Sequence, residues 1–599
     1  ALDPGLSADK RAAVSARCDG VPFYIEQVVA GISQTGVPET LYEPLFARLR
    51  ASPKVVPVVE AAAVIGRQID LGLLCSVVDL SDDEIDHVID ELEDALVLEP
   101  WGTGNWRFRH ELLREVAVEL APPSVRRGLH AKVAEVLSGG AGGEPDWGLI
   151  AGHYERAHRF DQAAAAYQQA SNDARRRGAL AEAATYLTRG LAQLDRATPG
   201  PDHDRRETAL RMERGFLTSA AEGYQSRDAA ADFERCLQLS DNLRDDELFA
   251  TLIALGNYYQ VRADLRRAAP VIESLRRGLE GQQWARPKID ILFGTMAYLR
   301  GDLNAATSAL EAATAVVAAA DQHKVDAEWF RVSEPISSGC LHLALVALVR
   351  GDLTRAEAEL ARSARLAEGF GFPEGPYMRA YTRSMETWLR VEAGHLDRAA
   401  VVAADMIKEG ERHGFDMWRL VGAIWQAAVG GLAALGDDDL DPTVLGAHIA
   451  TITALLDTLR TSEVIIYTTV YDGVIGRLLI AAGQPEAARE RLDTALALAQ
   501  DTGMCFYDAE LLRLRAHTHH DPAARQSDIT AALELARRQG ATLFELRAAL
   551  DDFELRGDPA SAGVADAADR IPADNAWPEL GRARVVLSER SQSASSDPA

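Results

Sequence analysis

Three histidines lie within four residues near the end of the chain, in the stretch HTHHDP (517–522). Clustered imidazoles are good ligands for zinc, so this stretch is the first candidate for a metal site. The sequence shows no cysteine or carboxylate cluster that must converge on these histidines, and the stretch lies where a polar turn between paired helices is expected. We therefore favour a solvated turn and predict no metal site.

A second candidate is the acidic stretch GDDDLDP (436–442), whose carboxylates could bind calcium. It lacks the ligand spacing and the terminal glutamate of a calcium-binding helix–loop–helix motif, so a charged loop is the better interpretation. Carboxylate pairs for acid–base catalysis stay open. Among 90 acidic residues some pairs must lie close together by coincidence.

Motifs that carry covalent or phosphate chemistry are missing from the sequence. It has no Gly-x-Ser-x-Gly elbow and no cysteine–histidine signature of a nucleophile. It also has no Gly-x-x-x-x-Gly-Lys-Ser/Thr loop to hold the phosphates of ATP, and VIGRQ (64–68) has neither the lysine nor a preceding strand. We predict no catalytic site in this chain, and whether the full protein is an enzyme stays open.

Cysteine usage, charge and hydropathy restrict the class of protein. The five cysteines are far apart and include no Cys-x-x-Cys pair, which favours reduced, buried thiols and a cytoplasmic location. The net charge of -27 repels phosphates and anionic lipids, so we expect no nucleic-acid partner. No secretory signal and no apolar run of about 20 residues is present, so we expect no membrane partner either.

Alanine and leucine dominate the sequence and strand-like alternation is rare, so we expect an all-α protein. One exception is LVLEPWGTGNWRFRH (96–110), in which two short apolar runs flank Gly102 and Gly104. This pattern predicts one small β-hairpin.

Three helical stretches precede this hairpin, at 54–66, 70–78 and 81–95, and the third opens on a capping-box pattern of Ser81 and Glu84. Three helices followed by a hairpin is the order of a winged-helix domain. The third stretch carries eight acidic residues and no lysine or arginine, so it would repel a DNA backbone. We interpret the domain as a joint between protein parts, with DNA reading as the weaker alternative.

Beyond residue 147 the chain repeats itself. RGDLNAATSALEAA (300–313) and RGDLTRAEAELARSA (350–364) share one pattern, and weaker copies occur elsewhere. After a short turn come an apolar residue, an alanine three places on, and a larger apolar residue four places further: Leu303, Ala306, Leu310; Leu353, Ala356, Leu360; Leu265, Ala268, Ile272; Pro485, Ala488, Leu492. These offsets form one helical stripe, whose small alanine lets a neighbouring helix approach closely.

Another helix lies upstream of each turn, so the repeating unit is a helical hairpin. LGNYYQVRADLRRAA (255–269) resembles the tetratricopeptide repeat, although the turns here are spaced more loosely than the 34 residues of that repeat. The resemblance implies a right-handed superhelix of helix pairs with a concave groove that binds a protein or small-molecule effector. An irregular helical domain is the alternative.

The N-terminal part of the chain carries a second resemblance. A Gly-x-Pro turn opens a helix in RCDGVPFYIEQVVAGI (17–32), followed by LYEPLFARLRASPKVVPVVEAAAVIG (41–66) and WRFRHELLREVAVELAPPSVRRGLHAKVAEVL (106–137). These stretches resemble the region after the nucleotide-binding core in signal-transduction ATPases with numerous domains. They are most similar to bacterial members that are fused to class III nucleotidyl cyclase domains or to transcription activators.

This resemblance implies a nucleotide site shared with a domain outside the chain. It places Gly20 and Pro22 in a turn that meets the adenine nucleotide, and His110 where a histidine senses the β-phosphate. ATP or ADP would be the cofactor of the full-length parent, with none held by this chain alone. The structural alternatives are a helix-initiating turn at Gly20 and Pro22 and a histidine packed at a helix start.

The expected layout is a helical lid remnant at 1–45, a winged helix at 46–137, a linker at 138–148, repeats at 149–555, and an extension at 556–599 whose polar end (588–599) is disordered. Because no phosphate-binding core is present, we expect a truncated chain whose partner is its own upstream nucleotide-binding domain. The implied function is regulatory. The repeats would bind an effector and relay binding through the winged helix to that domain, to oligomerisation, or to an attached adenylate or guanylate cyclase. The alternative is a peptide-docking scaffold without nucleotide coupling.

Overall fold

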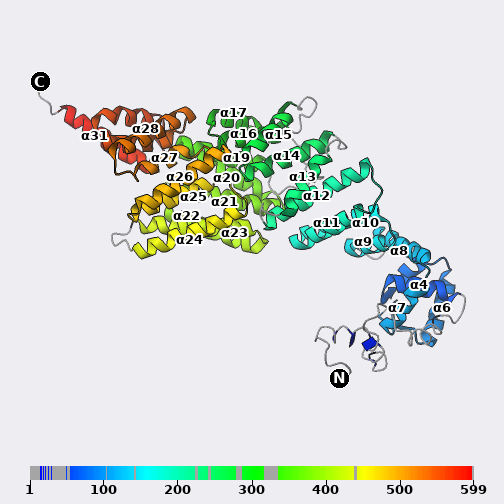
Figure 1. Cartoon of the computed structure of the whole chain (residues 1–599). Coiled ribbons are helices and arrows are strands. Elements are labelled where there is room, and N and C mark those ends of the chain that lie inside the picture. Colours follow the sequence, from blue (N-terminus) through cyan, green and yellow to red (C-terminus); the bar gives the residue numbers. More distant parts are fainter. Residues whose placement is uncertain are drawn as a thin grey trace. The chain divides into compact units, whose positions relative to one another are not determined.

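The computed structural model describes residues 12, 14, 15, 18, 21, 25, 28, 29, 49, 54–102, 104–140, 144–222, 227–239, 245–277, 286–315, 335–436 and 442–595. Contacts divide the chain into two compact units. The first comprises residues 1–173 and 185–199, and the second comprises residues 174–184 and 200–599. Figure 1 shows the described helices along the chain.

The first unit contains a small module of helices and three strands. Its elements are α4 Val55–Ile65, β1 Gln68–Asp70, α5 Leu71–Val77, α6 Asp82–Asp94, β2 Leu98–Pro100, β3 Asn105–Phe108, α7 Glu111–Leu120 and α8 Pro123–Ser138. The strands form an antiparallel sheet in the order β1-β3-β2, with Leu98 opposite Phe108 and Ile69 opposite Trp106. Phe108 is fully buried in the core that the sheet shares with α4 to α7.

The predicted hairpin is confirmed by the pairing of β2 with β3, and α4, α5 and α6 occupy the three predicted helical stretches. Ser81 and Glu84 form the capping box at the start of α6. Strand β1 is an addition that the sequence does not reveal, because three residues are too few to show alternation. The order helix, strand, helix, helix, strand, strand is compatible with a winged helix, which stays a prediction.

Helix α8 packs against α9 (Trp147–Arg156), and two buried histidines meet there. The Nδ1 atoms of His130 and His153 are 2.9 Å apart, and both residues are less than a tenth exposed. Helices α10 (Phe160–Arg176) and α11 (Leu180–Leu194) follow, each with residues in both units.

In the second unit the described helices contact one another in consecutive pairs (Figure 1). The first helices of these pairs are α12 Pro201–Glu222, α14 Asp245–Val261, α16 Arg286–Leu299, α19 Pro335–Arg350, α21 Glu374–Glu392, α23 Asp416–Ala434, α25 Thr468–Ala481, α27 Asp508–Ala516 and α29 Thr542–Arg556. The second helices are α13 Arg227–Gln238, α15 Leu265–Arg277, α17 Leu303–Ala315, α20 Leu353–Glu368, α22 Leu396–His413, α24 Pro442–Thr461, α26 Pro485–Thr502, α28 Pro522–Gln539 and α30 Ser561–Asp569. The predicted all-α class with tetratricopeptide-like helical repeats is confirmed.

The repeat pattern has a local physical cause at each turn. Gly301 and Gly351 take the left-handed backbone conformation, with φ of 78° and 81°, which glycine adopts without the steric cost of a Cβ atom. The next residue caps the following helix. The Asp302 carboxylate accepts a hydrogen bond from the Ala305 backbone N–H at 3.0 Å. The alanines of the stripe, including Ala306, are fully buried, as predicted.

The helices of a pair approach very closely where the facing residue is small. At Gly294 in α16, an added Cβ would lie 2.6 Å from Leu310 Cγ in α17. A larger residue at this position would therefore force the two helices apart.

The first helices also contact each other, both between neighbouring pairs and across the array. Helix α12 contacts α23, and α19 contacts α29. Backbone bonds join distant repeats too: the Ile466 N–H donates to Val261 O at 3.1 Å, and the Phe506 N–H donates to Leu299 O at 3.2 Å. We call this arrangement the closed array. Repeats far apart in the sequence are therefore in direct contact in the second unit.

The predicted disordered end is wrong for residues 588–595, which belong to α31 (Pro578–Ser595). This helix packs on α29 and α30, and the Trp577 indole beside its start donates to Gly351 O at 2.6 Å. Once its first turns are docked, the polar end continues the helix at little further cost. Residues 596–599 lie outside the described part.

One described helix, α24, is long and apolar enough to cross a membrane by length and composition, which by itself is weak evidence. It packs between α23 and α25 and buries Leu445, Ile452, Leu456 and Leu459. Helix α24 therefore has the contacts of a second helix in the repeat array.

Candidate functional site

An apolar cavity of about 70 Å³ lies among the repeats of the second unit. Its walls come from α21, α23 and α25, the end of α14, and residues 464–467 between α24 and α25. Five of the lining side chains are aromatic: Tyr377, Tyr381, Trp418, Tyr467 and Tyr471. The rings of Tyr381 and Trp418 stack with centroids 5.4 Å apart. We call this space the aromatic cavity.

The segment 462–467 forms one wall of the cavity and is held in an unusual conformation. Glu463 and Tyr467 both have positive φ, at 53° and 63°, which costs a residue with a side chain about 1–2 kcal/mol. Glu463 forms an ion pair with Arg262, directly after α14. Glu463 takes the left-handed position that ends α24, as Gly301 does after α16, whereas Tyr467 takes it directly before α25.

A buried histidine fixes the hydroxyl groups beside the cavity. His342 Nδ1 lies 2.7 Å from the Ser338 carbonyl oxygen, which can only accept, so this nitrogen carries the proton. Nε2 therefore accepts from the Tyr467 hydroxyl at 2.7 Å, and the Tyr381 hydroxyl, 3.2 Å from that of Tyr467, donates to it. Burial lowers the pKa of His342 to about 4, so the imidazole is neutral at physiological pH.

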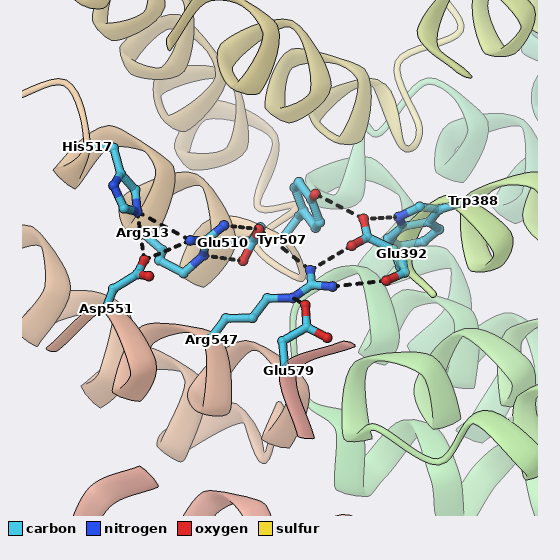
Figure 2. A network of polar contacts seen from close by, with 9 residues as sticks. All are labelled: Trp388, Glu392, Tyr507, Glu510, Arg513, His517, Arg547, Asp551 and Glu579. Atoms are coloured by element: carbon cyan, nitrogen blue, oxygen red, sulfur yellow. Dashed lines mark hydrogen bonds and ion pairs between the residues drawn. The ribbon is translucent and has the colours of Figure 1, made fainter. Parts of the chain in front are cut away.

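A second feature is a buried set of charged side chains that joins distant repeats (Figure 2). Its members are Trp388, Glu392, Tyr507, Glu510, Arg513, His517, Arg547, Asp551 and Glu579. Arg547 in α29 is at its centre. It donates to Glu392 of α21 at 2.6 Å and to Glu579 of α31 at 2.8 Å. We call this set the charge network.

Neighbouring members complete the hydrogen bonding of the network. The Trp388 indole donates to Glu392 at 2.9 Å, and Arg513 bridges Glu510 and Asp551 at 2.8 Å and 2.7 Å. Burial by itself raises the pKa of Glu510, but the guanidinium groups of Arg513 and Arg547 lower it to about 2. The Glu510 carboxylate is therefore ionised, and Arg513 and Arg547 each contact at least two carboxylates of the network.

The three clustered histidines are placed differently from the predicted solvated turn. His517 Nε2 lies 2.7 Å from Asp551, and His519 Nε2 lies 2.9 Å from Asp528, both on neighbouring helices. The stretch does lie at the turn between α27 and α28, as predicted, but these two side chains are only partly exposed there because each pairs with a carboxylate. His520, with a side chain 83% exposed, does lie in solvent.

One described group of side chains, His203, Asp204 and Glu207, has ligand atoms close enough together to suggest a metal site. Glu207, however, already pairs with Arg211 at 2.7 Å and with Arg235 at 3.0 Å. Two guanidinium groups on the same carboxylate make this a salt-bridge cluster. The acidic stretch 437–441 lies outside the described residues.

The predicted nucleotide-contacting residues are placed only in part. Gly20 and Pro22 lie outside the described residues, so the turn that they were expected to form is not placed. His110 is the half-buried N-cap residue of α7, in extended conformation. A histidine at a helix N-terminus is compatible with a phosphate contact, because the helix dipole favours an anion there. The role of all three residues stays a prediction.

The five cysteines are free thiols, as predicted, and Cys18, Cys236 and Cys340 are fully buried. Sequence reasoning missed both the aromatic cavity and the charge network. No local signal marked the network, because a stretch such as FELRAALDDF (544–553), with Arg547 among three carboxylates, reads as an ordinary charged helix.

Comparison with known proteins gives distant relatives. No family profile matches the chain. It is 22% identical over 557 residues to an uncharacterized protein, R02095, of Rhizobium meliloti (strain 1021), over 88% of this chain and 53% of that protein. The chain thus spans about half the length of the curated relative that it matches.

Three solved structures share stacked helices with the chain. A Rap protein in complex with competence and sporulation factor is 13% identical, covers 62% of this chain and 99% of its own, and has a TM-score of 0.39. A signal-transduction ATPase with numerous domains and a tetratricopeptide repeat sensor, from Pyrococcus horikoshii, is 11% identical over 98% of this chain and 72% of its own, with a TM-score of 0.26. Yeast Tom70 is 12% identical over 79% and 97%, with a TM-score of 0.26. No functional conclusion follows at these scores; the helix pairs of the chain itself define a tetratricopeptide-like scaffold suited to protein interaction.

Proposed function

We propose that this chain is the regulatory sensor region of a longer bacterial signal-transduction ATPase with numerous domains. The repeats bind a protein or small-molecule effector. Binding is relayed through the winged-helix module to a nucleotide-binding domain elsewhere in the parent protein, and from there to oligomerisation or to an attached nucleotidyl cyclase.

The observation that carries this proposal is the closed array with its charge network. Arg547 holds Glu392, 155 residues away in the sequence, in a buried ion pair. Moving two ions out of water is costly, so such a pair stabilises the closed array only modestly, and we propose that an open state is accessible. An effector that binds the closed and open states with different affinity can then shift the balance between them.

The nucleotide contact of the proposal rests on the sequence resemblance. ATP or ADP would be held mainly by the upstream domain, with Gly20 and Pro22 beside the base and His110 beside a phosphate. The position of His110 at the N-terminus of α7 supports that role, because the first N–H groups of a helix favour an anion.

Nucleotide binding by the longer gene product tests the proposal. We expect calorimetry to detect ADP or ATP binding and the His110→Ala variant to weaken it several-fold. His87→Ala is the matched control, since the His87 side chain is 76% exposed on α6 and should leave the affinity unchanged. If the longer protein binds neither nucleotide, the ATPase assignment is lost and a docking scaffold without nucleotide coupling remains.

A further inference from the structure

Helix α31 continues the series of first helices. It contacts α29 as α29 contacts α27, and it contacts α30 as each first helix contacts the second helix before it. The sequences agree as well, because IGRLL (475–479) of α25 and LGRAR (580–584) of α31 share a glycine–arginine step. Unlike the earlier first helices, α31 has no second helix packed on it in the part of the chain that the structure describes.

A glycine marks the place where the second helix packs in two earlier pairs. An added Cβ at Gly294 of α16 would lie 2.6 Å from Leu310 Cγ of α17. At Gly476 of α25 it would lie 2.9 Å from Leu492 Cδ2 of α26. Both leucines are the last residue of the repeat stripe. At Gly581, the matching glycine of α31, no described atom beyond the helix's own backbone lies within 4 Å of such a Cβ, so this position has room for a leucine.

A groove of about 410 Å³ adjoins Gly581. It lies between residues 568–573, at the end of α30, and the face of α31 that carries Leu580, Arg584 and Leu587. Val585, the next residue on α31, is 57% exposed. A helix that only ends a repeat array normally turns a polar face outward. The exposed valine, the open glycine and the groove are instead the features of a face that another helix covers.

The repeats themselves define what fits this face. In each earlier pair the covering helix carries a stripe of an apolar residue, an alanine and a larger apolar residue. A second copy of this chain does not offer such a stripe, because the stripe residues of its described repeats, such as Ala488 and Leu492, are fully buried. Two copies, each with a net charge of -27, would also repel one another.

The side chains at the groove add a charge preference. Arg584 is exposed and forms no ion pair within the described residues. A helix lying in the groove with a carboxylate near Arg584 would form one. The fitting partner is therefore an amphipathic helix of another protein, with one apolar stripe and an acidic flank.

We propose that the groove beside α31 binds an amphipathic helix of a partner protein, which takes the place of the second helix of this last pair and places a leucine-sized side chain on Gly581. This inference names a protein as the effector and rests on the effector-binding part of the proposed function. Its test needs no nucleotide. Failure to bind the helix overturns the docking site, whereas failure to bind nucleotide overturns the ATPase assignment.

A synthetic peptide of residues 485–502 is a suitable probe, because in the chain it covers α25, whose sequence is similar to that of α31. In fluorescence anisotropy titrations we expect saturable binding of the labelled peptide to the whole chain. Gly581→Leu should weaken binding at least about 10-fold, because the leucine fills the space that the peptide needs. The variant should fold, since the position is open and leucine favours a helix more than glycine does.

The matched control is Gly446→Leu in α24, where likewise no atom lies within 4 Å of an added Cβ. This substitution should leave the affinity unchanged. In the peptide, Leu492→Asp should abolish binding, because it removes the side chain that would lie on Gly581. In the protein, Arg584→Glu should weaken binding about 2- to 5-fold, and added salt should reduce this effect.

Three results would overturn the proposal. The first is that the peptide does not bind. The second is that Gly581→Leu binds it as tightly as wild type, which is the outcome expected if the peptide only displaces α26 from its own place in the chain. The third is that sedimentation shows a dimer that Gly581→Leu separates, because the face would then be covered by a second copy.

Discussion

Arg547 is the residue on which the closed array depends most. Its side chain is 8% exposed and contacts three carboxylates, those of Glu392, Glu510 and Glu579. The attraction within such a group roughly balances the cost of burying it, but removing Arg547 leaves the buried Glu392 and the half-buried Glu579 without the cation that they share, while Glu510 keeps Arg513. The cost of losing Arg547 is therefore much larger than the net stabilisation that the intact network provides.

Replacing Arg547 by methionine, which keeps an unbranched apolar stem and removes the charge, should destabilise the closed array by roughly 3–5 kcal/mol. Native-state hydrogen exchange of α21 and α29 measures the change in their free energy of opening. The matched control is Arg538→Met, since the Arg538 side chain is 67% exposed and its ion pair with Glu534 is long, at 3.9 Å. The control should change stability by no more than about 0.5 kcal/mol. Equal effects of the two substitutions would contradict a central role for Arg547.

At the scale of elements, local patterns were enough to predict the helical hairpins. A glycine that takes a left-handed conformation, a capping aspartate, a buried leucine and a buried alanine all lie within six residues, as in Gly301 to Ala306. Together these residues end one helix and start the next, and all of them lie within one short window of sequence. The hairpin of β2 and β3 was predictable for the same reason, through its two apolar runs and its glycines.

The candidate site could not be predicted in this way. Glu392 and Arg547 are 155 residues apart, and His342 and Tyr467 are 125 residues apart. Such pairs meet only because many repeats add their small rotations and return the chain to an earlier helix. The sum of these rotations cannot be read from local sequence patterns, so the contacts between distant repeats were not predicted.

The junction of α8 and α9 should make the first unit sensitive to acid. Burial, with the nearby His153, Arg156 and Arg126, lowers the pKa of His130 to about 3, and burial with Arg156 lowers that of His153 to about 4. In the unfolded chain both imidazoles take up protons near their ordinary pKa of about 6.5. Between the unfolded-state pKa of about 6.5 and these lowered folded-state values, the unfolded state binds more protons than the folded state. The free energy of unfolding is therefore full above about pH 6.5 and decreases as the pH falls below it.

We expect the free energy of unfolding of the first unit to fall by roughly 2–4 kcal/mol between pH 7 and pH 5. His153→Gln, which removes one of the two titrating groups, should make this fall clearly smaller, whereas His87→Gln on the exposed face of α6 should not. Thermal melting of the first unit across this pH range gives the comparison. If the stability of the His153→Gln variant falls with pH as steeply as that of the wild type, the buried histidine pair does not control the acid sensitivity of the first unit.

At the scale of the whole molecule, the second unit is held together by contacts between repeats that are far apart in sequence. Helix α19 contacts α29, Trp577 donates to Gly351 O, and the Thr354 N–H donates to Asn575 at 3.0 Å. A repeat array in which each unit touches only its neighbours opens and closes locally, whereas long-range contacts make distant repeats cooperative. Binding of an effector to one repeat can then change the stability of a distant repeat, as the proposed sensor function requires.

Hydrogen–deuterium exchange of the segments 462–467 and 503–507 tests the closed array most directly. In both segments, backbone N–H groups donate to carbonyls of distant first helices: Ile465 and Ile466 to Val261, and Phe506 to Leu299. The closed array predicts that these amides exchange as slowly as those of the buried first helices, and that Arg547→Met accelerates them. If they exchange at the rate of an exposed turn in the wild-type protein, the repeats do not close on one another and the account is contradicted.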